Sequence, residues 1–206
     1  MAQTEGAPAK RGRPRSDRAR EAILAAAADL LLEQGPDAVS MDAVAARAGV
    51  SKATIYRWWR TKETLALDAL YHEWEAVRPR SRSTDSLEGD LIALLRPWLR
   101  LLTQRPHGRV FGALLAKVQS DKVFGEQYRA RFVEHRRNEA AAVFQRAIDR
   151  GEIPADTNLE VALDLLFAPF YLRLLQGHAP LNARFMRDVV EMVVAGVRCG
   201  EVGSRS

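Results

Sequence analysis

The sequence predicts an all-α protein, and three observations support this. Apolar residues recur at spacings of three and four along most of the 206 residues, which is the period of an amphipathic helix. No segment alternates apolar and polar residues as a half-buried strand would. Glycine and proline, as at Gly35-Pro36, separate the periodic segments, so we expect helices joined by loops.

The first helix is expected over residues 17–34. Its apolar residues at positions 23, 26, 27, 30 and 31 form one stripe. Ser16 or Asp17 can cap its start, and Gly35-Pro36 ends it. This segment is the first helix of a predicted three-helix module.

A second, shorter helix is expected over residues 40–48. Ser40 suits its N-cap, and Asp42 in the first turn complements the positive end of the helix dipole. The apolar stripe of this helix consists of Val44, Ala45 and Ala48.

A tight turn joins this helix to a third one. Gly49 can adopt the left-handed conformation that ends a helix, and Ser51 can cap the next helix. Ile55 and Trp59 are four residues apart and should both pack inward. The residues left on the outer face are Lys52, Ala53, Tyr56 and Arg57.

Residues 47–62 read RAGVSKATIYRWWRTK, with five basic residues and no acidic one. Helix, tight turn and short basic helix are typical of a helix-turn-helix, whose second helix enters the major groove of DNA. The alternative interpretation is an ordinary helical hairpin with a solvated basic rim.

Three runs of sequence within residues 17–65, AILAAAADLLLEQG, SMDAVAARAGVSKATIYRWW and TKETL, resemble the TetR family of bacterial transcriptional regulators. Trp59 departs from the pattern, because the family more often has phenylalanine there, but both side chains fill an apolar slot. The resemblance implies a dimeric DNA-binding protein whose helical body binds a small-molecule effector.

We expect Lys52, Ala53 and Thr54, at the start of the third helix, to contact base edges. Lys52 can donate a hydrogen bond to guanine, and the Ala53 methyl group can touch a thymine methyl. The resemblance implies phosphate contacts for Tyr56 and Lys62, whereas Arg57 is left open between base and phosphate. The full predicted set is Arg11, Arg13, Arg15, Ser40, Ser51, Lys52, Ala53, Thr54, Tyr56, Arg57 and Lys62.

Residues 1–16 are predicted to form a disordered basic arm. Its run KRGRPR resembles an AT-hook, in which extended arginines lie along a narrow minor groove. We expect Arg11, Arg13 and Arg15 to contact the minor groove or phosphates, with Pro14 keeping the arm extended. An unstructured solubilising tail is the alternative.

After the DNA-binding domain at residues 17–65, residues 66–206 should form a helical domain for effector binding and dimerisation. Its first helix, starting at Lys62 under a Thr61 cap, links the two domains. The helices are expected at residues 62–77, 87–104 with a bend at Pro97, 109–119, 122–150, 158–176 and 181–198.

The last two helices carry more apolar surface than one-sided packing needs. Pairing both with their two-fold copies gives a four-helix dimer interface, which the resemblance also implies, and a palindromic operator requires two readers. A buried central helix in a monomer is the alternative. The expected interface residues are Leu163, Leu166, Phe167, Leu174, Met186, Val189, Val190, Val193 and Val197.

The resemblance also implies an effector cavity among the middle helices. Aromatic residues at helical spacing are equally typical of an ordinary core, and nothing in the sequence specifies the effector. The expected lining residues are Trp74, Trp98, Leu102, Phe111, Leu115, Phe132 and Phe170, with His107 or Tyr171 as polar contacts.

The sequence lacks the arrangements typical of an enzyme or a metal site. Its four histidines are scattered without an HxxxH pair, and it has no phosphate-binding glycine loop and no Gly-x-Ser-x-Gly turn. We therefore expect no catalytic residue, cofactor or metal. The single cysteine, Cys199, excludes an internal disulfide.

Charge and hydropathy favour a cytoplasmic DNA-binding protein. The net charge is +5, and residues 1–65, with 11 basic and 8 acidic residues, account for +3 of it. The longest apolar run, residues 165–172, is far shorter than the roughly 18 residues of a membrane span. No apolar segment follows the basic N-terminus, so we expect neither a secretory signal nor a membrane partner.

The expected function is that of a sequence-specific transcriptional regulator, a repressor released from its operator by an effector. The sequence does not distinguish repressor from activator. A constitutive or architectural DNA-binding protein would need no effector. An enzyme would need a convergent polar cluster in the body, and the sequence shows none.

Overall fold

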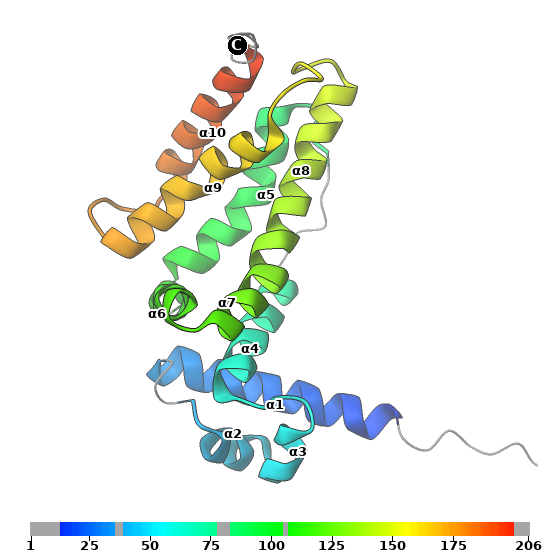
Figure 1. Cartoon of the computed structure of the whole chain (residues 1–206), viewed down its shortest axis with the longest axis vertical. Helices are drawn as coiled ribbons and strands as arrows, with labels where there is room; N and C mark the ends of the chain where they lie inside the picture. Colours follow the sequence, from blue (N-terminus) through cyan, green and yellow to red (C-terminus); the bar gives the residue numbers. More distant parts are fainter. Residues whose placement is uncertain (1–12, 36–38, 78–82, 105–106, 200–206) are drawn as a thin grey trace, which may run out of the picture. The chain divides into compact units, whose positions relative to one another are not determined.

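The computed structural model describes residues 13–35, 39–77, 83–104 and 107–199, with side chains from Ser16 onward. Every regular element within these ranges is a helix, which confirms the all-α prediction (Figure 1). The chain divides into two compact units between Ala69 and Leu70. This point lies inside a helix, four residues beyond the boundary expected from the sequence.

The first unit contains α1 (Arg13–Gln34), α2 (Met41–Ala48), α3 (Lys52–Tyr56) and the beginning of α4 (Lys62–Val77). α2 packs against both α1 and α3. The buried side chains that the three helices share include Ile23, Leu31, Val44 and Ile55, each at most 1% exposed.

The start of α1 corrects one expectation. The helix begins at Arg13, four residues before the expected start, so Arg13 and Arg15 belong to a helix and not to an extended arm. Pro14 is compatible with this, because the first turn of a helix leaves its backbone N–H groups unbonded. Arg11 lies outside the described residues.

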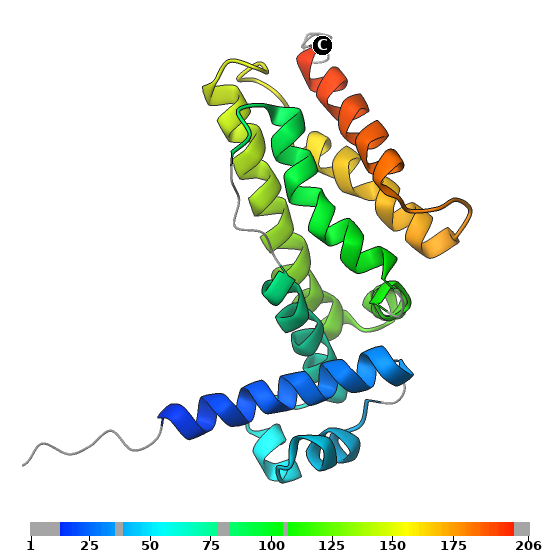
Figure 2. The ribbon, with the colours of Figure 1, turned by 180° about the vertical axis from the view of Figure 1, so that it is seen from behind.

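The second unit is built from six α-helices and the second half of α4. They are α5 (Leu87–Thr103), α6 (His107–Ser120), α7 (Lys122–Tyr128), α8 (Glu134–Asp149), α9 (Leu159–Gln176) and α10 (Ala183–Arg198). α5 packs against α6, α8 and α10, and α9 contacts both α8 and α10 (Figures 1 and 2). α5 continues through Pro97.

The segment expected as a single helix over 122–150 consists of three parts. A π-helical stretch, Arg129–Val133, separates α7 from α8. Tyr128, Phe132 and Arg136, spaced four apart across this stretch, are all buried. The rings of Tyr128 and Phe132 stack at 5.4 Å. Periodicity alone could not separate the parts, because apolar residues recur every three or four positions in all three.

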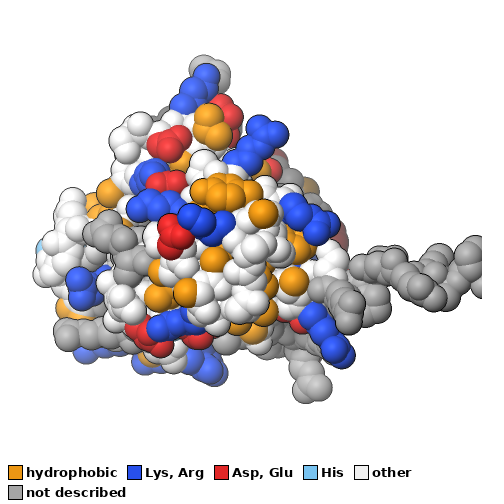
Figure 3. Space-filling model, turned by 90° about the horizontal axis from the view of Figure 1, so that it is seen from below, with side chains coloured by type: hydrophobic (Ala, Val, Ile, Leu, Met, Phe, Trp, Pro, Cys, Tyr) orange, Lys and Arg blue, Asp and Glu red, His pale blue; other side chains and the backbone are white. Residues whose placement is uncertain are grey.

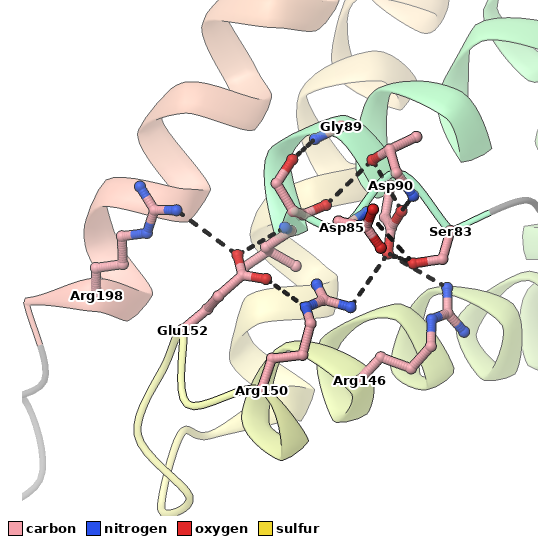
Figure 4. Close-up of polar contacts among 11 residues, drawn as sticks. Ser83, Asp85, Gly89, Asp90, Arg146, Arg150, Glu152 and Arg198 are labelled. Atoms are coloured by element: carbon pink, nitrogen blue, oxygen red, sulfur yellow. Dashed lines mark hydrogen bonds and ion pairs between the residues drawn. The ribbon is translucent and has the colours of Figure 1, made fainter.

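One end of the second unit is held by a polar cluster around Asp90, whose side chain is buried (Figure 4). Its carboxylate accepts hydrogen bonds from the Thr84 backbone N–H at 2.5 Å and the Thr84 hydroxyl at 2.9 Å. Arg146 and Arg150 lie 3.7 Å from it. Burial raises the pKa of Asp90, but these hydrogen bonds and arginines outweigh it and hold the pKa below its usual range.

Glu152 belongs to the same cluster and joins three elements. It accepts a hydrogen bond from the Leu87 backbone N–H at 2.8 Å, at the start of α5, and pairs with Arg150 beyond α8. Arg198 of α10 lies 3.7 Å away (Figure 4). The cluster therefore fixes the ends of α5, α8 and α10 against one another.

Candidate DNA-binding surface and effector cavity

Both ends of the tight turn in the first unit have the expected cap geometry. The Ser40 hydroxyl accepts a hydrogen bond from the Ala43 backbone N–H at 3.1 Å, and Ser51 accepts one from Thr54 at 3.2 Å. Gly49 has φ 66°, in the left-handed region that favours glycine. These contacts end α2 and start α3 within three residues, which produces a helix-turn-helix.

The faces of α3 also match the expectation. Ile55 and Trp59 are buried at 0% and 2%, whereas Lys52, Ala53, Tyr56 and Arg57 are exposed. The Arg57 guanidinium lies 5.4 Å from the Trp58 ring centre. Lys62, at the start of α4, is exposed as well. Figure 3, the view from below, where α2 and α3 lie in Figure 1, shows Lys and Arg side chains spread over this surface.

Two positions differ from the sequence expectation. Thr54 is half-buried, and its hydroxyl lies 2.9 Å from the Ser51 hydroxyl, so it takes part in the cap. Ala48 is only half-buried, whereas Met41, at the other end of α2, is buried along with Val44 and Ala45.

An ion pair that the sequence did not reveal crosses the turn. The Lys52 ammonium lies 2.9 Å from the Asp42 carboxylate, and this contact raises the pKa of Lys52 above its ordinary value. Lys52 therefore stays charged at neutral pH, but its charge faces an internal partner while DNA is absent. Ten residues separate the two, so helical spacing gives no signal of the pair.

Trp59 is anchored by more than packing. Its indole Nε1–H donates a hydrogen bond to the Asp68 carboxylate in α4 at 2.8 Å. The Arg20 guanidinium of α1 lies 5.8 Å from the Trp59 ring centre. A phenylalanine at this position would fill the slot but could not form the bond to Asp68.

Within the second unit, side chains from α4, α5, α6, the π-helical stretch and α8 surround a small cavity. Its volume is about 10 Å³, enough for about one water molecule. Four of the residues that line it were expected from the sequence to line an effector cavity: Trp74, Trp98, Phe111 and Phe132. The other lining residues are Tyr71, Leu101, Arg131, His135 and Arg136.

Arg136 is the most informative residue that the sequence analysis missed. It begins the buried stripe of α8, which continues with Ala140, Val143, Phe144 and Ala147. A charged residue at the first position of an apolar helical stripe is the signal that could have found it, because long charged side chains are rarely buried.

The remaining expected lining residues lie around the cavity and not on it. Phe170 and Tyr171 of α9 pack edge-on against the Trp98 ring, at 5.1 and 5.9 Å between ring centres. Leu102 is buried and Leu115 half-buried, and neither lines the cavity. Burial lowers the pKa of His107, although the negative charge of Glu73 acts in the opposite direction and raises it.

Comparison with known proteins agrees with this geometry. Residues 23–69 match the family model described as bacterial regulatory proteins of the tetR family. Residues 82–193 match the model described as tetracyclin repressor-like, C-terminal domain. The chain belongs to the TetR family.

Relatives and solved structures of TetR-family proteins extend over most of the chain. HTH-type transcriptional regulator YdeS of Bacillus subtilis is 38% identical over 189 residues, covering 92% of this chain and 94% of that protein. The DNA-binding transcriptional repressor TetR of Mycobacteroides abscessus is 32% identical over 173 residues, covering 84% and 90%. The structure of the TetR family regulator SCO0332 aligns with TM-score 0.77 and 33% identity, covering 87% and 98%.

A further solved structure, Flavonoid-responsive Regulator FrrA, aligns with TM-score 0.62 and 25% identity, covering 88% of this chain and 95% of that one. All these proteins are regulators and none is named as an enzyme. The chain is therefore a TetR-family helix-turn-helix transcriptional regulator, with a DNA-binding unit followed by a helical ligand-binding domain. No helix in the described part of the chain is long and apolar enough to span a bilayer.

TetR-family regulators are dimeric, and the expected interface residues stay a prediction, since a single chain is described. Packing of α9 and α10 against α5 and α8 buries most of them within the protomer. The buried residues are Leu163, Leu166, Phe167, Met186, Val189, Val190 and Val193; Leu174 and Val197 are half-buried.

Other apolar residues on the same two helices face outward. Val161, Leu165, Leu172 and Leu175 of α9 are 50–58% exposed, and Met192 of α10 is 76% exposed. Val161, Leu165 and Met192 line a groove of about 460 Å³ between the two helices, together with Val193 and Val197. Asp156, Thr157 and Asn158 of the preceding loop also line this groove, so its apolar residues lie next to a polar edge.

Proposed function

We propose that this regulator is a dimeric repressor that leaves a palindromic operator when a small molecule occupies the aromatic cavity. The observation that carries the proposal is the extent of α4. Its first residue, Lys62, belongs to the DNA-binding unit, and Tyr71 and Trp74, on its second half, line the cavity. One continuous helix therefore belongs to both sites.

In this proposal the outer face of α3 enters the major groove. Lys52 and Ala53 contact base edges, whereas Tyr56 and Lys62 contact phosphates. The Arg57 guanidinium lies over the Trp58 ring, and from there it could contact either a base or a phosphate. Because the target is DNA, we place the protein with the chromosome in the cytoplasm.

The outward apolar residues of α9 and α10 would pair with a second copy of the chain. Five large side chains at least half-exposed on two adjacent helices form a patch that a monomer rarely leaves in water. A four-helix arrangement with two-fold symmetry would cover them and set the distance between the two α3 helices.

The switch follows from linkage between the two sites. An effector that binds more tightly to a state unable to engage both half-sites lowers operator affinity, and DNA lowers effector affinity by the same factor. The name of the similar FrrA says that it responds to flavonoids, which supports a response to small aromatic molecules here. Because the cavity has a volume of only about 10 Å³, binding of a ligand would require its aromatic side chains to move.

The test compares operator affinity with and without saturating indole or 1-naphthoate, using an operator selected from random duplex DNA. We expect at least one of the two probes to weaken operator binding in the wild type. Ala69→Leu, at a fully buried position of α4, should change the ratio of the two affinities more than it changes binding of the probe alone. Ala76→Leu, at an exposed position of the same helix, is the matched control and should behave as wild type.

Two results would contradict the proposal. An unchanged ratio in Ala69→Leu would remove α4 from the coupling. A ratio of one for both probes in the wild type, despite measurable binding, would favour a constitutive regulator.

A further inference from the structure

Arg136 is one of two buried charged residues in the described chain, with 7% of its surface exposed. The other, Asp90, has two arginines and two hydrogen bonds from Thr84. Among the described residues, Arg136 donates to the Tyr171 hydroxyl, and no carboxylate lies within ion-pair distance of it. A buried cation without an anionic partner is costly, and its retention calls for an explanation.

The neighbours of Arg136 are aromatic rings. Its guanidinium carbon lies 4.7 Å from the ring centre of Trp98, 5.0 Å from Phe167 and 5.2 Å from Tyr171. Such contacts orient the guanidinium without neutralising it. Arg137, the next residue in α8, is different, because it pairs with both Glu160 and Asp164 on the surface.

Two further hydrogen-bond donors lie around Arg136. The indole Nε1–H of Trp98 is buried and has no hydrogen-bond partner in the described chain. The buried hydroxyl of Tyr128 lies beside Tyr171 and Arg136 themselves. Burial raises the pKa of Tyr128, so this phenol stays neutral and able to donate. The nearby Glu75 and Glu139 face His135, at 3.8 and 3.7 Å. The groups that contact the Arg136 guanidinium are thus the Tyr171 hydroxyl and aromatic rings, and no ion pair of Arg136 with a carboxylate is formed among the described residues.

We infer that Arg136 binds the carboxylate of an aromatic acid, which is the effector class of this regulator. The guanidinium fork matches a carboxylate in two parallel hydrogen bonds. The Trp98 indole N–H and the Tyr128 hydroxyl can donate hydrogen bonds to the remaining lone pairs of the carboxylate. The rings of Trp74, Phe111 and Phe132 can pack against the aromatic ring of the ligand. This inference rests on the proposed function, because it assigns a ligand to the same cavity.

The test uses a matched pair of probes, 1-naphthoate and its uncharged counterpart 1-naphthamide. Binding of each is measured by calorimetry to the full chain as wild type and as Arg136→Met, Arg136→Lys and Arg187→Met. Arg187 is exposed on α10, so its substitution makes the same change in net charge outside the cavity. Methionine fills a similar volume without the charge, and lysine keeps the charge without the fork.

We expect wild type and Arg187→Met to bind the acid at least tenfold more tightly than the amide. Arg136→Met should abolish this preference, and Arg136→Lys should retain only part of it. Equal affinity for acid and amide in the wild type, no binding of the acid, or an unchanged preference in Arg136→Met would each overturn the inference. If Arg136→Met does not fold, the wild-type comparison and Arg136→Lys still decide the question.

Operator binding measured on the same samples separates this inference from the proposed function. An acid that binds through Arg136 but leaves operator affinity unchanged supports the assigned ligand class and contradicts release by effector. A neutral amide that binds as tightly as the acid and releases the operator supports release and contradicts the assigned class.

Discussion

Lys52 and Asp42 form an ion pair across the turn of the helix-turn-helix, with 2.9 Å between the ammonium and the carboxylate. Both side chains are more than half exposed, so the pair is open to exchange with an external partner. In the proposed binding mode, Lys52 would have to leave Asp42 to donate to a base edge, and Asp42 would then lie near the DNA phosphates. We therefore expect the pair to lower operator affinity.

Asp42→Asn should increase operator affinity by about two- to fivefold at low salt, because it removes the competing partner and a repulsive charge. Fluorescence anisotropy of a labelled operator measures this. Asp29→Asn, on an exposed part of α1, makes the same charge change away from Lys52. An equal gain in both variants would show that only overall charge matters.

Lys62→Ala should weaken binding to all DNA sequences alike, because Lys62 is proposed to contact a phosphate. The slope of log affinity against log salt concentration should fall by about two per dimer, one phosphate contact per subunit.

Lys52→Ala should instead lower affinity for an operator that carries the preferred base by about 5- to 150-fold and relax the preference at that base position. Salt titrations and base-substitution scanning of the operator distinguish the two. The assignments would have to be exchanged if Lys62→Ala altered preference at one base pair.

Met192→Glu should dissociate the dimer, because it places a charge in the apolar surface that we propose as the interface. We expect the dimer dissociation constant to rise by at least about tenfold, since burying an unpaired charge is strongly unfavourable. Sedimentation velocity over a dilution series measures this. Val123→Glu in α7 replaces another exposed apolar residue, 63% exposed, and should leave the dimer intact. Equal dissociation constants for Met192→Glu and wild type would place the interface elsewhere.

Asp90 should make stability depend on acid pH. Its pKa is lowered in the folded state, so its contribution is present above the unfolded value of about 3.9 and is lost as pH falls through the folded value. Asp90→Asn should destabilise the protein at pH 7 by about 2 kcal/mol or more, since it breaks charge-assisted hydrogen bonds of a buried group. It should also lose less stability below pH 4 than wild type does.

Urea unfolding at pH 7 and pH 3.5 tests this prediction, with exposed Asp188→Asn as the control for charge. An identical pH dependence in Asp90→Asn and wild type would assign the acid sensitivity to other carboxylates, of which Glu152 is the first candidate, because its pKa is also lowered.

Local signals in the sequence predicted the helix-turn-helix well. Ser40, Gly49 and Ser51 act on backbone groups within three or four residues, so their effects do not depend on the rest of the fold. Four of the residues that line the cavity, all aromatic, were among those expected, because the resemblance placed a cavity among helices rich in such residues, and their contact with an effector stays a prediction. Long-range ion pairs, such as Asp42 with Lys52, have no periodic signal and appear only in the structure.

Most of the residues expected at the interface are buried within the protomer, for a physical reason. Apolar spacing reports that a residue is buried, and it does not report what buries it. Leu166 and Val190 are fully buried by their own protomer, whereas Leu165 and Met192, outside the main stripes, face outward. Arg136 was missed for a related reason: it lies on the buried stripe of α8, but a charged residue is not counted in an apolar pattern.

The hydrogen bond from Trp59 to Asp68 has a consequence for how the regulator moves. It joins the end of the helix-turn-helix to the first two turns of α4. The division between the units comes directly afterwards, at Ala69 and Leu70, inside the same helix and not in a loop. In the proposed switch, any reorientation of the DNA-binding unit would therefore require α4 itself to bend.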